Sequence, residues 1–238
     1  MAHIKPLAID LFCGLGGWTE GLLAEGYRVV GFDIEQHVYG EARYPAQLVL
    51  QDVLTIHGRQ FKNAALIVAS PPCQEYSYMA MPWSRAKAIA TEYRSGKRDV
   101  KQLTALFDAC FRIQREACEA AGHRIPLIVE NVRGAIPWVG RSRWNFGSFH
   151  LWGDVPAVMP VTIKAHKVPG FRFDGSGKSF QSASVAGIKH HGSGEVWCDT
   201  GPASVSSKSS ARKFASAMIA KIPLPLSRHI ARTFKPSE

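Results

Sequence analysis

The stretch that decides the fold is "LAIDLFCGLGGWTEGLLAEGYRVVGFDI", residues 7–34. Continuous apolar runs at 7–12 and 27–34 predict two strands that are buried on both faces, as in parallel sheets covered by helices. A glycine-rich turn follows the first run, and the segment behind it predicts a short helix that ends at Gly26. The stretch therefore predicts one strand–helix–strand unit of an α/β fold.

Three more apolar runs, at 47–52, 65–70 and 126–131, continue this pattern. Between the last two lies a predicted helical stretch, 84–121, with apolar residues at helical spacing. They are Leu103, Leu106, Phe107, Cys110, Ile113 and Ala117, and Cys118 is expected to pack beside them. Strands that alternate with helices predict a doubly wound, Rossmann-like α/β sheet.

The amino-acid composition changes after residue 155. Residues 156–208 are rich in Gly, Ser and Lys and have no helical period, which predicts a small irregular lobe. Residues 209–238 regain order as two short helical segments, split by Pro223 and Pro225. The sequence thus predicts a main domain over 1–155, a small lobe, and C-terminal helices that return to the main domain.

Composition narrows the class of protein. The chain has 238 residues, of which 46% are hydrophobic, enough for one core and a small extra lobe. It contains no 18-residue apolar run, and its start lacks a signal-peptide layout, so a membrane span is not expected and a cytoplasmic location is. The five cysteines are accordingly interpreted as thiols rather than as a disulfide framework.

The net charge of +10 is unevenly distributed. Residues 156–238 hold twelve Lys and Arg against four Asp and Glu, a balance of +8, whereas residues 1–155 hold seventeen against fifteen, a balance of +2. A basic C-terminal third beside a nearly neutral body favours a polyanionic partner such as nucleic acid.

Two features of the first half favour a nucleoside-bearing cofactor. "DLFCGLGG", residues 10–17, places glycines where a strand turns into a helix, so that a ligand can approach the backbone. Asp33, Glu35 and Asp52 follow the second and third strands, where carboxylates can accept hydrogen bonds from ribose hydroxyls. The spacing is G-x-G-G, so the dinucleotide fingerprint is absent.

A thiol stands directly behind the fourth strand, in "SPPCQ". Pro71 and Pro72 prevent the strand from continuing, so Cys73 is expected to project into the crevice at the carboxyl ends of the strands. "VENVRG" places Glu130 at the end of the next strand. A nucleophilic thiol and a carboxylic acid facing one bound base form a coherent catalytic pair.

The motifs "DLFCGLGG", "PPCQ" and "ENV", in this order, resemble the signature of the cytosine-5 DNA methyltransferases. The resemblance covers about residues 7–135, and "AKIPLPLSRHIA" near the C-terminus is similar to the closing segment of the family. The chain as a whole, including "NFGSFHLWGDVP", looks most like the compact phage and prophage members.

The resemblance implies a site for S-adenosyl-L-methionine. The loop would hold the cofactor, Asp33 would bind its ribose, Ile34 would pack on the adenine, and Asp52 would lie near the adenine amino group. The full set of implied cofactor residues is Asp10, Phe12, Cys13, Gly14, Gly16, Gly17, Asp33, Ile34, Asp52, Pro71 and Lys221.

The resemblance also implies a mechanism. Cys73 would attack C6 of a cytosine flipped out of duplex DNA, and Glu130 would bind N3 and the exocyclic amine. The segment after Gln74 would close over the base. The implied catalytic set is Cys73, Gln74, Glu130, Asn131, Arg141 and Arg143; the two arginines match the family's Gln-x-Arg-x-Arg motif only in part.

Two departures from the family pattern raise further hypotheses. Residues 156–208 number 53, which is small for a target-recognition lobe, so a short recognition sequence, low specificity or a second subunit is expected. Lys164, Lys167, Arg172, Lys178 and Lys189 are predicted phosphate contacts of this lobe. Lys221 stands where the family usually has Asn, and its ammonium could pair with a carboxylate. An alternative cofactor is therefore a carboxylated S-adenosyl-L-methionine, whose product would be carboxymethylcytosine.

Other interpretations stay open at this point. The chain could be a DNA-binding module without catalysis, or an RNA cytosine methyltransferase, although the Cys-Phe-Thr signature of the tRNA branch is missing. His190, His191 and Cys198 lack the spacing of a zinc site, so no metal is predicted. Neither a monomer nor a homodimer is favoured, and modification, evasion of restriction and regulation are all compatible with the sequence.

Overall fold

The computed structural model describes residues 5–74, 76, 83–146, 149–159 and 210–236. Its centre is a sheet with the strand order β5-β2-β1-β6-β7-β9-β8. The first five of these strands are parallel: β1 (Leu7–Leu11), β2 (Arg28–Asp33), β5 (Gln47–Leu50), β6 (Ala64–Ala69) and β7 (Leu127–Asn131). The hairpin of β8 (Trp144–Phe146) and β9 (Phe149–Gly153) extends the sheet antiparallel to β7. The predicted doubly wound α/β fold is confirmed, and all five expected strands are present.

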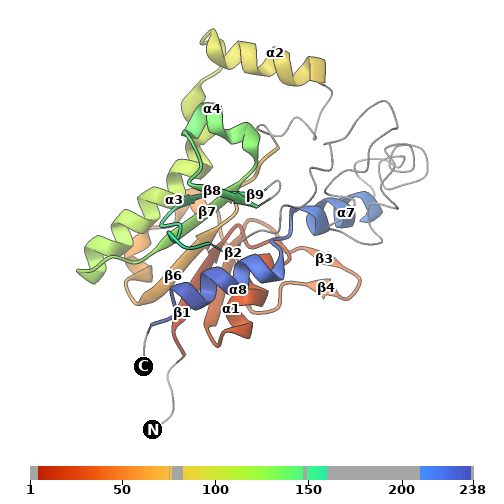
Figure 1. The fold of residues 1–238 in the computed structure, drawn as a ribbon. Helices are drawn as coiled ribbons and strands as arrows, with labels where there is room; N and C mark the ends of the chain where they lie inside the picture. Colours follow the sequence, from red (N-terminus) through yellow and green to blue (C-terminus); the bar gives the residue numbers. More distant parts are fainter. Residues whose placement is uncertain (1–4, 75, 77–82, 147–148, 160–209, 237–238) are drawn as a thin grey trace.

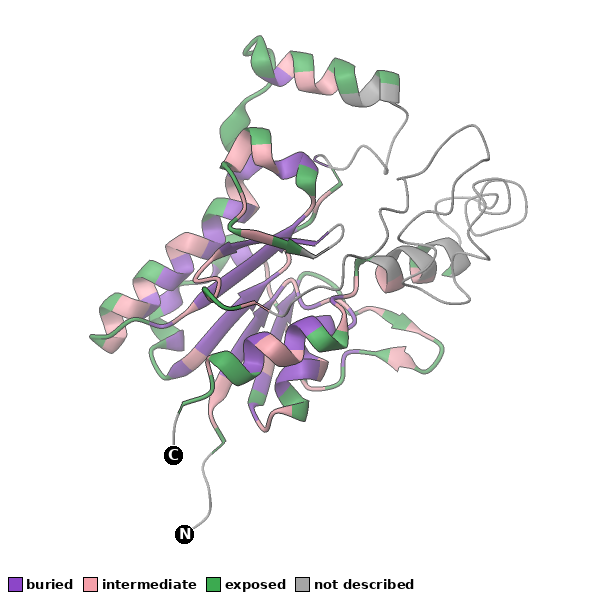
Figure 2. Cartoon of the chain, viewed as in Figure 1, coloured by how far each residue is buried: buried purple, intermediate pink, exposed green. Residues whose placement is uncertain are grey.

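One face of the sheet is covered by the long helix α3 (Val100–Ala121), which buries the predicted stripe against the strands (Figure 1). Leu103, Phe107, Cys110, Ile113 and Ala117 are all buried, whereas Leu106 is only partly covered. Figure 2 shows the buried residues following the inner side of this helix and the strands beneath it. Cys110 is fully inaccessible, and the Cys118 thiol contacts the backbone of Ile125, so both are packing cysteines.

The single helix expected over 84–121 is wrong. The structure has two helices, α2 (Trp83–Arg94) and α3, separated by a turn. Gly96 adopts φ 76° there, which only glycine adopts at low cost, and Asp99 caps α3 by accepting a hydrogen bond from the backbone N–H of Lys101. The break lets α2 stand away from the sheet (Figure 1).

The opposite face is covered by α1 (Gly17–Ala24) and α8 (Leu224–Thr233), which lie side by side. A Cβ atom built on Gly21 would lie 2.2 Å from the Ser227 hydroxyl oxygen, so only glycine allows these helices to approach so closely. The Tyr27 hydroxyl donates to the carbonyl of Ala231, which joins the end of the chain to the start of β2. Helix α7 (Ser210–Ala220) precedes α8.

Pro223 separates the two C-terminal helices as expected, but Pro225 does not. It lies in the first turn of α8, where the missing N–H would have had no helical partner. The 156–208 lobe, with its five basic residues and the His190, His191 and Cys198 group, falls outside the described residues apart from 156–159.

The remaining elements are short. They are the hairpin β3 (Val38–Tyr39) and β4 (Ala42–Arg43), the 3₁₀ helices η1 (Val53–Thr55), η2 (Gly58–Phe61) and η3 (Arg133–Ala135), and helix α4 (Ile136–Val139). Within the described part of the chain, no helix combines the length and the apolar character needed to cross a bilayer.

Candidate active site and cofactor cleft

The strand order places a crevice between β1 and β6. The chain runs outward from β1 to β2 and β5, then returns to the other side of β1 to form β6 and β7. At such a switch point the loops after neighbouring strands diverge, which leaves a crevice at their carboxyl ends. The glycine turn follows β1 and the Pro-Pro-Cys turn follows β6, so the two sequence motifs face this crevice from its two sides.

The turn after β1 is tightly constrained. Phe12 has φ 58°, a left-handed conformation that non-glycine residues rarely adopt, and Gly14 and Gly16 are also left-handed. A Cβ atom built on Gly14 would meet no heavy atom within 4 Å, so this turn borders open space. A Cβ atom on Gly17 would lie 2.4 Å from the backbone nitrogen of Ile222, so the closing segment packs directly behind the turn.

Asp33, at the end of β2, holds the turn in place. Its Oδ2 accepts a hydrogen bond from the N–H of Gly14 at 2.9 Å, and its Oδ1 accepts one from the N–H of Ile34 at 2.8 Å. Burial alone would raise the pKa of Asp33, but the hydrogen bonds from His37 and Gly14 outweigh it and lower the pKa below its usual range. This carboxylate is therefore kept ionised beside the turn.

The pKa of Asp10, near the end of β1, is shifted in the opposite direction. Its Oδ2 accepts a hydrogen bond from the Thr19 hydroxyl at 2.6 Å, and that hydroxyl also contacts the Tyr44 hydroxyl at 2.6 Å. Its Oδ1 is buried and has no hydrogen-bond partner among the described residues. Burial raises the pKa of Asp10 to about 7, although Thr19 acts against the shift.

An apolar surface lies next to these carboxylates. Ile34, Leu50 and Leu54 follow the carboxyl ends of β2 and β5, and their side chains are 73%, 58% and 48% exposed. Exposed aliphatic side chains near the ionised Asp33 carboxylate match the two halves of a nucleoside, since the flat base is apolar on its faces and the ribose carries hydroxyls. The third carboxylate, Asp52, caps η1 and accepts a hydrogen bond from the N–H of Leu54.

Cys13 and Lys221, two of the implied cofactor residues, are both engaged by other parts of the protein. Cys13 is buried, and burial followed by the charges of Asp10 and Asp33 raises the pKa of its thiol far above the usual range, so it is not a nucleophile. The Lys221 ammonium donates to Glu20 Oε1 at 2.5 Å, which joins the closing segment to α1. A carboxylated cofactor would have to share this ammonium with Glu20.

On the other side of the crevice, the tips of β6 and β7 are bound together. The Asn131 side-chain amide donates to the carbonyl of Pro71 at 3.0 Å. The Trp18 indole N–H donates to the Ser70 hydroxyl at 3.0 Å, and Ser70 hydrogen-bonds the Glu130 carboxyl. A chain of polar contacts therefore runs from the cofactor helix α1 to the acid on β7.

Cys73 and Glu130 influence each other directly. Burial raises the pKa of Glu130 to about 8, against a smaller opposing effect of Ser70. Burial also raises the pKa of Cys73 to about 11, and the negative charge of Glu130 adds to this shift. The predicted thiol and carboxyl group therefore lie close enough for the charge of one to affect the pKa of the other. At neutral pH both groups carry their protons.

Three other implied catalytic residues lie elsewhere. Gln74 faces a pocket on the α3 side of the turn. Arg141 and Arg143 are exposed and precede β8, two strands away from β7. Trp144 lies in the same row as Leu151 and Glu130, so Arg143 lies one residue further from the carboxyl edge than that row. Their catalytic role stays a prediction.

The sequence analysis did not single out two histidines near the site. His37 lies 3.7 Å from Asp33 Oδ1, and this contact raises the pKa of the imidazole. His150, on β9, is paired with Asn131 across the sheet; it contacts the Ser142 hydroxyl through Nδ1, and burial lowers its pKa. Only strand pairing reveals the second residue, because nineteen positions separate it from Asn131.

Comparison with known proteins identifies the family. The family model described as C-5 cytosine-specific DNA methylase matches residues 7–135, more than half of the chain. The chain belongs to the C-5 cytosine-specific DNA methylase family. The match spans the glycine turn, the Pro-Pro-Cys turn and the Glu-Asn pair, so this chain contains the family's motifs on both sides of the crevice. Methyltransferases of this family use S-adenosyl-L-methionine.

Solved structures that this chain resembles are larger. One, a structure described as a DNA modification methyltransferase encoded within a prophage of E. coli, is 21% identical, with a TM-score of 0.35 and coverage of 56% of this chain and 33% of its own. The S. pombe Dnmt2 methyltransferase is 16% identical, with a TM-score of 0.36 and coverage of 57% and 37%. The Entamoeba histolytica methyltransferase EhMeth is 17% identical, with a TM-score of 0.36 and coverage of 58% and 41%. The methylase therefore spans about two fifths or less of each, and no curated protein matches it.

Proposed function

We propose that this methylase transfers a methyl group from S-adenosyl-L-methionine to C5 of cytosine in duplex DNA. The observation that supports this most directly is the placement of Cys73 and Glu130 on neighbouring strand ends, with the Asn131–Pro71 hydrogen bond holding the two turns together. The target base has to leave the stack, because neither side chain can reach the ring inside a duplex.

Glu130 acts as the acid in this proposal. With a pKa of about 8 it is protonated at neutral pH, so it can donate its proton to N3 of the flipped cytosine. Protonation at N3 withdraws electrons from the ring and makes C6 electrophilic. A carboxyl group with an ordinary pKa would be ionised and would instead oppose the attack.

Cys73 acts as the nucleophile. Its sulfur bonds to C6 as the thiol proton passes to solvent, and the C5–C6 double bond becomes an enamine that is nucleophilic at C5. As sulfur attacks C6, negative charge would otherwise build up on the ring, and protonation of N3 neutralises it. After C5 has gained its substituent it loses its proton to solvent, the S–C6 bond breaks, the Cys73 sulfur regains a proton from solvent, and the N3 proton returns to Glu130.

The residues around the glycine turn fit the proposed cofactor. S-adenosyl-L-methionine supplies an electrophilic methyl group on its sulfonium when bound. The unpartnered Asp10 Oδ1 suits the cofactor's ammonium group, the ionised Asp33 suits ribose hydroxyls, and Ile34 suits the adenine face. Because Glu20 already neutralises Lys221, we propose the ordinary cofactor rather than its carboxylated analogue.

The decisive experiment is covalent trapping. A duplex in which 5-fluorocytosine replaces cytosine is incubated with protein and cofactor; because fluorine cannot leave C5 as a proton does, the sulfur–C6 bond persists. We expect a denaturation-resistant adduct that Cys73→Ala abolishes and Cys118→Ala, a change at a cysteine packed against Ile125, preserves. An intact complex without an adduct would indicate a DNA-binding module instead, and trapping on tRNA but not on duplex DNA would indicate an RNA methyltransferase.

A further inference from the structure

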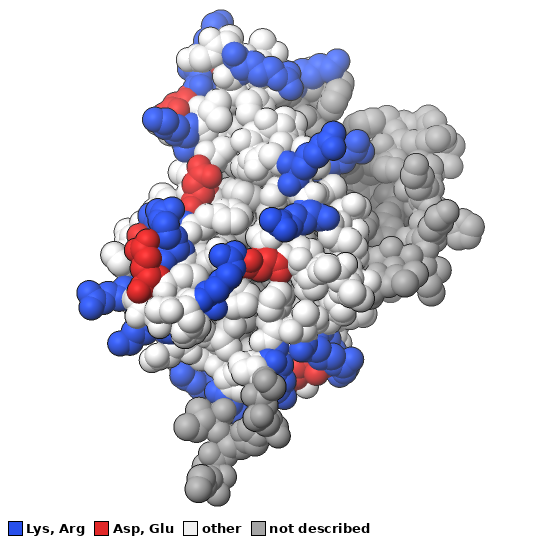
Figure 3. Space-filling view, turned by 60° about the vertical axis from the view of Figure 1, so that its left-hand side comes forward, with Lys and Arg blue, Asp and Glu red and all other residues white. Residues whose placement is uncertain are grey.

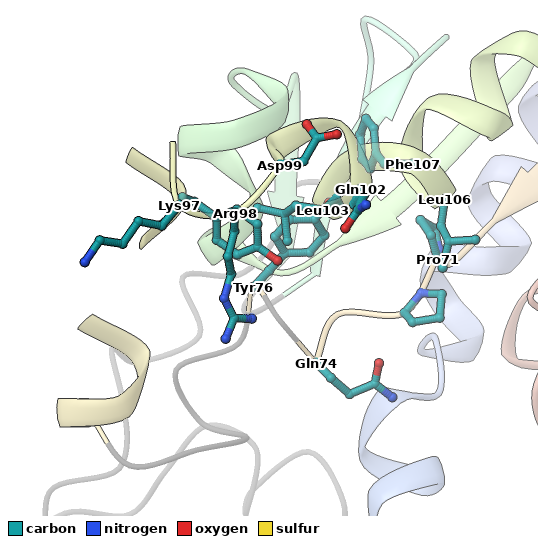
Figure 4. Close-up of a pocket in the computed structure, with 12 residues that line it drawn as sticks. Pro71, Gln74, Tyr76, Lys97, Arg98, Asp99, Gln102, Leu103, Leu106 and Phe107 are labelled. Carbon is teal, nitrogen blue, oxygen red and sulfur yellow. The ribbon is translucent and has the colours of Figure 1, made fainter. Parts of the chain in front are cut away.

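A pocket of about 640 Å³ lies behind the catalytic turn. The turn from Pro71 to Tyr76 forms one side, and the first two turns of α3 with the residues preceding them form the other (Figure 4). Neither Cys73 nor Glu130 lines it, so it is separate from the proposed catalytic pair, although Gln74 belongs to both the turn and the pocket. Its volume falls within the range of sites that bind small molecules.

The walls suit a planar aromatic ring. Tyr93, Leu103, Leu106 and Phe107 supply flat or aliphatic surfaces, and the amides of Gln74 and Gln102 lie on opposite sides of the pocket (Figure 4). Base stacking on aromatic and apolar side chains is how proteins bind unstacked nucleobases, and Gln amides read base edges because each has a donor and an acceptor.

The mouth of the pocket carries charges of both signs. Lys97 and Arg98 are both exposed on its rim; Asp99 lines the pocket beside them and caps α3, and Glu92 binds Arg98. Of the two cations at the rim, Lys97 is therefore the one available for a phosphate. Figure 3 shows how Lys, Arg, Asp and Glu side chains are distributed over one face of the molecule. A pocket that combines aromatic and aliphatic side chains with two amides and a lysine at its rim has the groups that a nucleotide requires.

We propose that this pocket binds the base of a nucleotide adjacent to the target cytosine in the same strand, with its phosphate at the Lys97–Arg98 rim. This inference rests on the proposed function, because the occupant is assigned by the adjacency of Gln74 to Cys73. The pocket then determines sequence preference at one flanking position. Recognition of a flanking base by the main domain would supplement the sequence recognition expected from the short 156–208 segment.

The test is flanking-base preference on a random-sequence duplex library, read by bisulfite sequencing after methylation. We expect the wild-type protein to discriminate at least about fivefold between bases at one position beside the cytosine, as for a typical side-chain contact with a base edge. Gln102→Ala should reduce this below about twofold at that position and leave the other positions unchanged. Gln102 is exposed, so the truncation does not disturb the core.

Two lysines on this segment provide a matched comparison. Lys97→Ala should lower total methylation at 150 mM salt by about threefold to tenfold, because it removes a phosphate contact. Lys101→Ala, which removes an exposed lysine that does not line the pocket, should have little effect. Unchanged flanking preference in Gln102→Ala, or equal losses in the two lysine variants, would overturn the pocket assignment. Total methylation by the wild-type protein reports the proposed function separately.

Discussion

The two sides of the crevice are built differently. On the cofactor side, the ionised Asp33 carboxylate accepts hydrogen bonds from the backbone N–H groups of Gly14 and Ile34, so a charged side chain holds the glycine turn. On the catalytic side, the tips of β6 and β7 are joined by uncharged groups, through the Asn131–Pro71 bond and the Trp18–Ser70–Glu130 contacts. An ionised carboxylate suits the hydroxyls of a bound ribose. Uncharged partners suit an acid, Glu130, that must lose and regain a proton.

Each side nevertheless contains one buried carboxyl group with a raised pKa. Asp10 and Glu130 both titrate near neutral pH because burial disfavours their ionised forms. Their proposed partners differ in charge, since Asp10 faces a cationic ammonium and Glu130 faces a neutral base. Burial therefore has different consequences on the two sides. We expect Asp10 to become an anion when the cofactor's ammonium binds, and Glu130 to act as a proton donor to the base.

Glu130→Gln should produce the largest effect among the carboxyl variants. The amide cannot transfer a proton to N3, so kcat should fall by about 10²- to 10⁴-fold, the usual contribution of a general acid. Binding of S-adenosyl-L-methionine, measured by titration calorimetry, should stay within twofold of wild type. A variant that kept normal turnover would remove Glu130 from the mechanism.

Asp10→Asn should act on the cofactor instead. Loss of a hydrogen bond between charged groups, worth about 1.5–3 kcal/mol, should weaken S-adenosyl-L-methionine binding by about 10- to 100-fold. In the wild-type protein the affinity should rise between pH 5.5 and pH 7 as Asp10 ionises, and calorimetry should find this rise absent in the variant. The contrast between the two sides would fail if Asp10→Asn lowered kcat and left cofactor affinity intact.

The sequence was sufficient to predict the sheet, because the sheet depends on local signals: apolar runs mark the strands, and prolines mark the turn after β6. The catalytic roles of Cys73 and Glu130 stay predictions, although the structure places the two residues in electrostatic contact. The break in the predicted helix lies at Gly96 and Asp99, a helix stop and a helix cap, and the apolar residues that indicated the helix all come after it, from Leu103 onward.

What the sequence could not reveal depends on contacts between distant residues. His150 comes to Asn131 only through the antiparallel pairing of β9 with β7. The pairing of Lys221 with Glu20, across about two hundred positions, requires α1 and the closing segment to be packed together. Burial of Asp10 and Glu130, which sets their pKa values, likewise results from the assembled sheet and its helices.

The free energy of unfolding should also depend on the protonation of the buried Glu130 carboxyl group. The pKa of Glu130 is about 8 in the folded state and near 4.5 when unfolded, so the unfolded state binds fewer protons between these values. The free energy of unfolding therefore falls as pH rises through this window. Glu130→Gln removes the penalty, and its Tm should exceed that of wild type by several degrees at pH 8 and by little at pH 5. Calorimetry of Glu119→Gln, at an exposed position on α3, should show no such trend.

The smallest predicted effect concerns a positioning residue on the cofactor side. The Arg112 guanidinium donates to the carbonyls of Ile56 at 2.8 Å and Leu54 at 3.2 Å, and so fastens the segment that begins at Asp52 to helix α3. Arg112→Met keeps the aliphatic stem but removes these bonds, each worth about 1 kcal/mol.

The expected result is a KM for S-adenosyl-L-methionine raised about threefold to tenfold with kcat unchanged, because Arg112 touches neither reacting group. Arg115→Met, at an exposed position three residues along the same helix, should leave both constants at wild-type values. A loss of kcat in Arg112→Met without a change in KM would mean that α3 supports the catalytic turn rather than the cofactor cleft. In that case the division of the crevice into a cofactor side and a catalytic side would have to be redrawn around this helix, which packs beneath both.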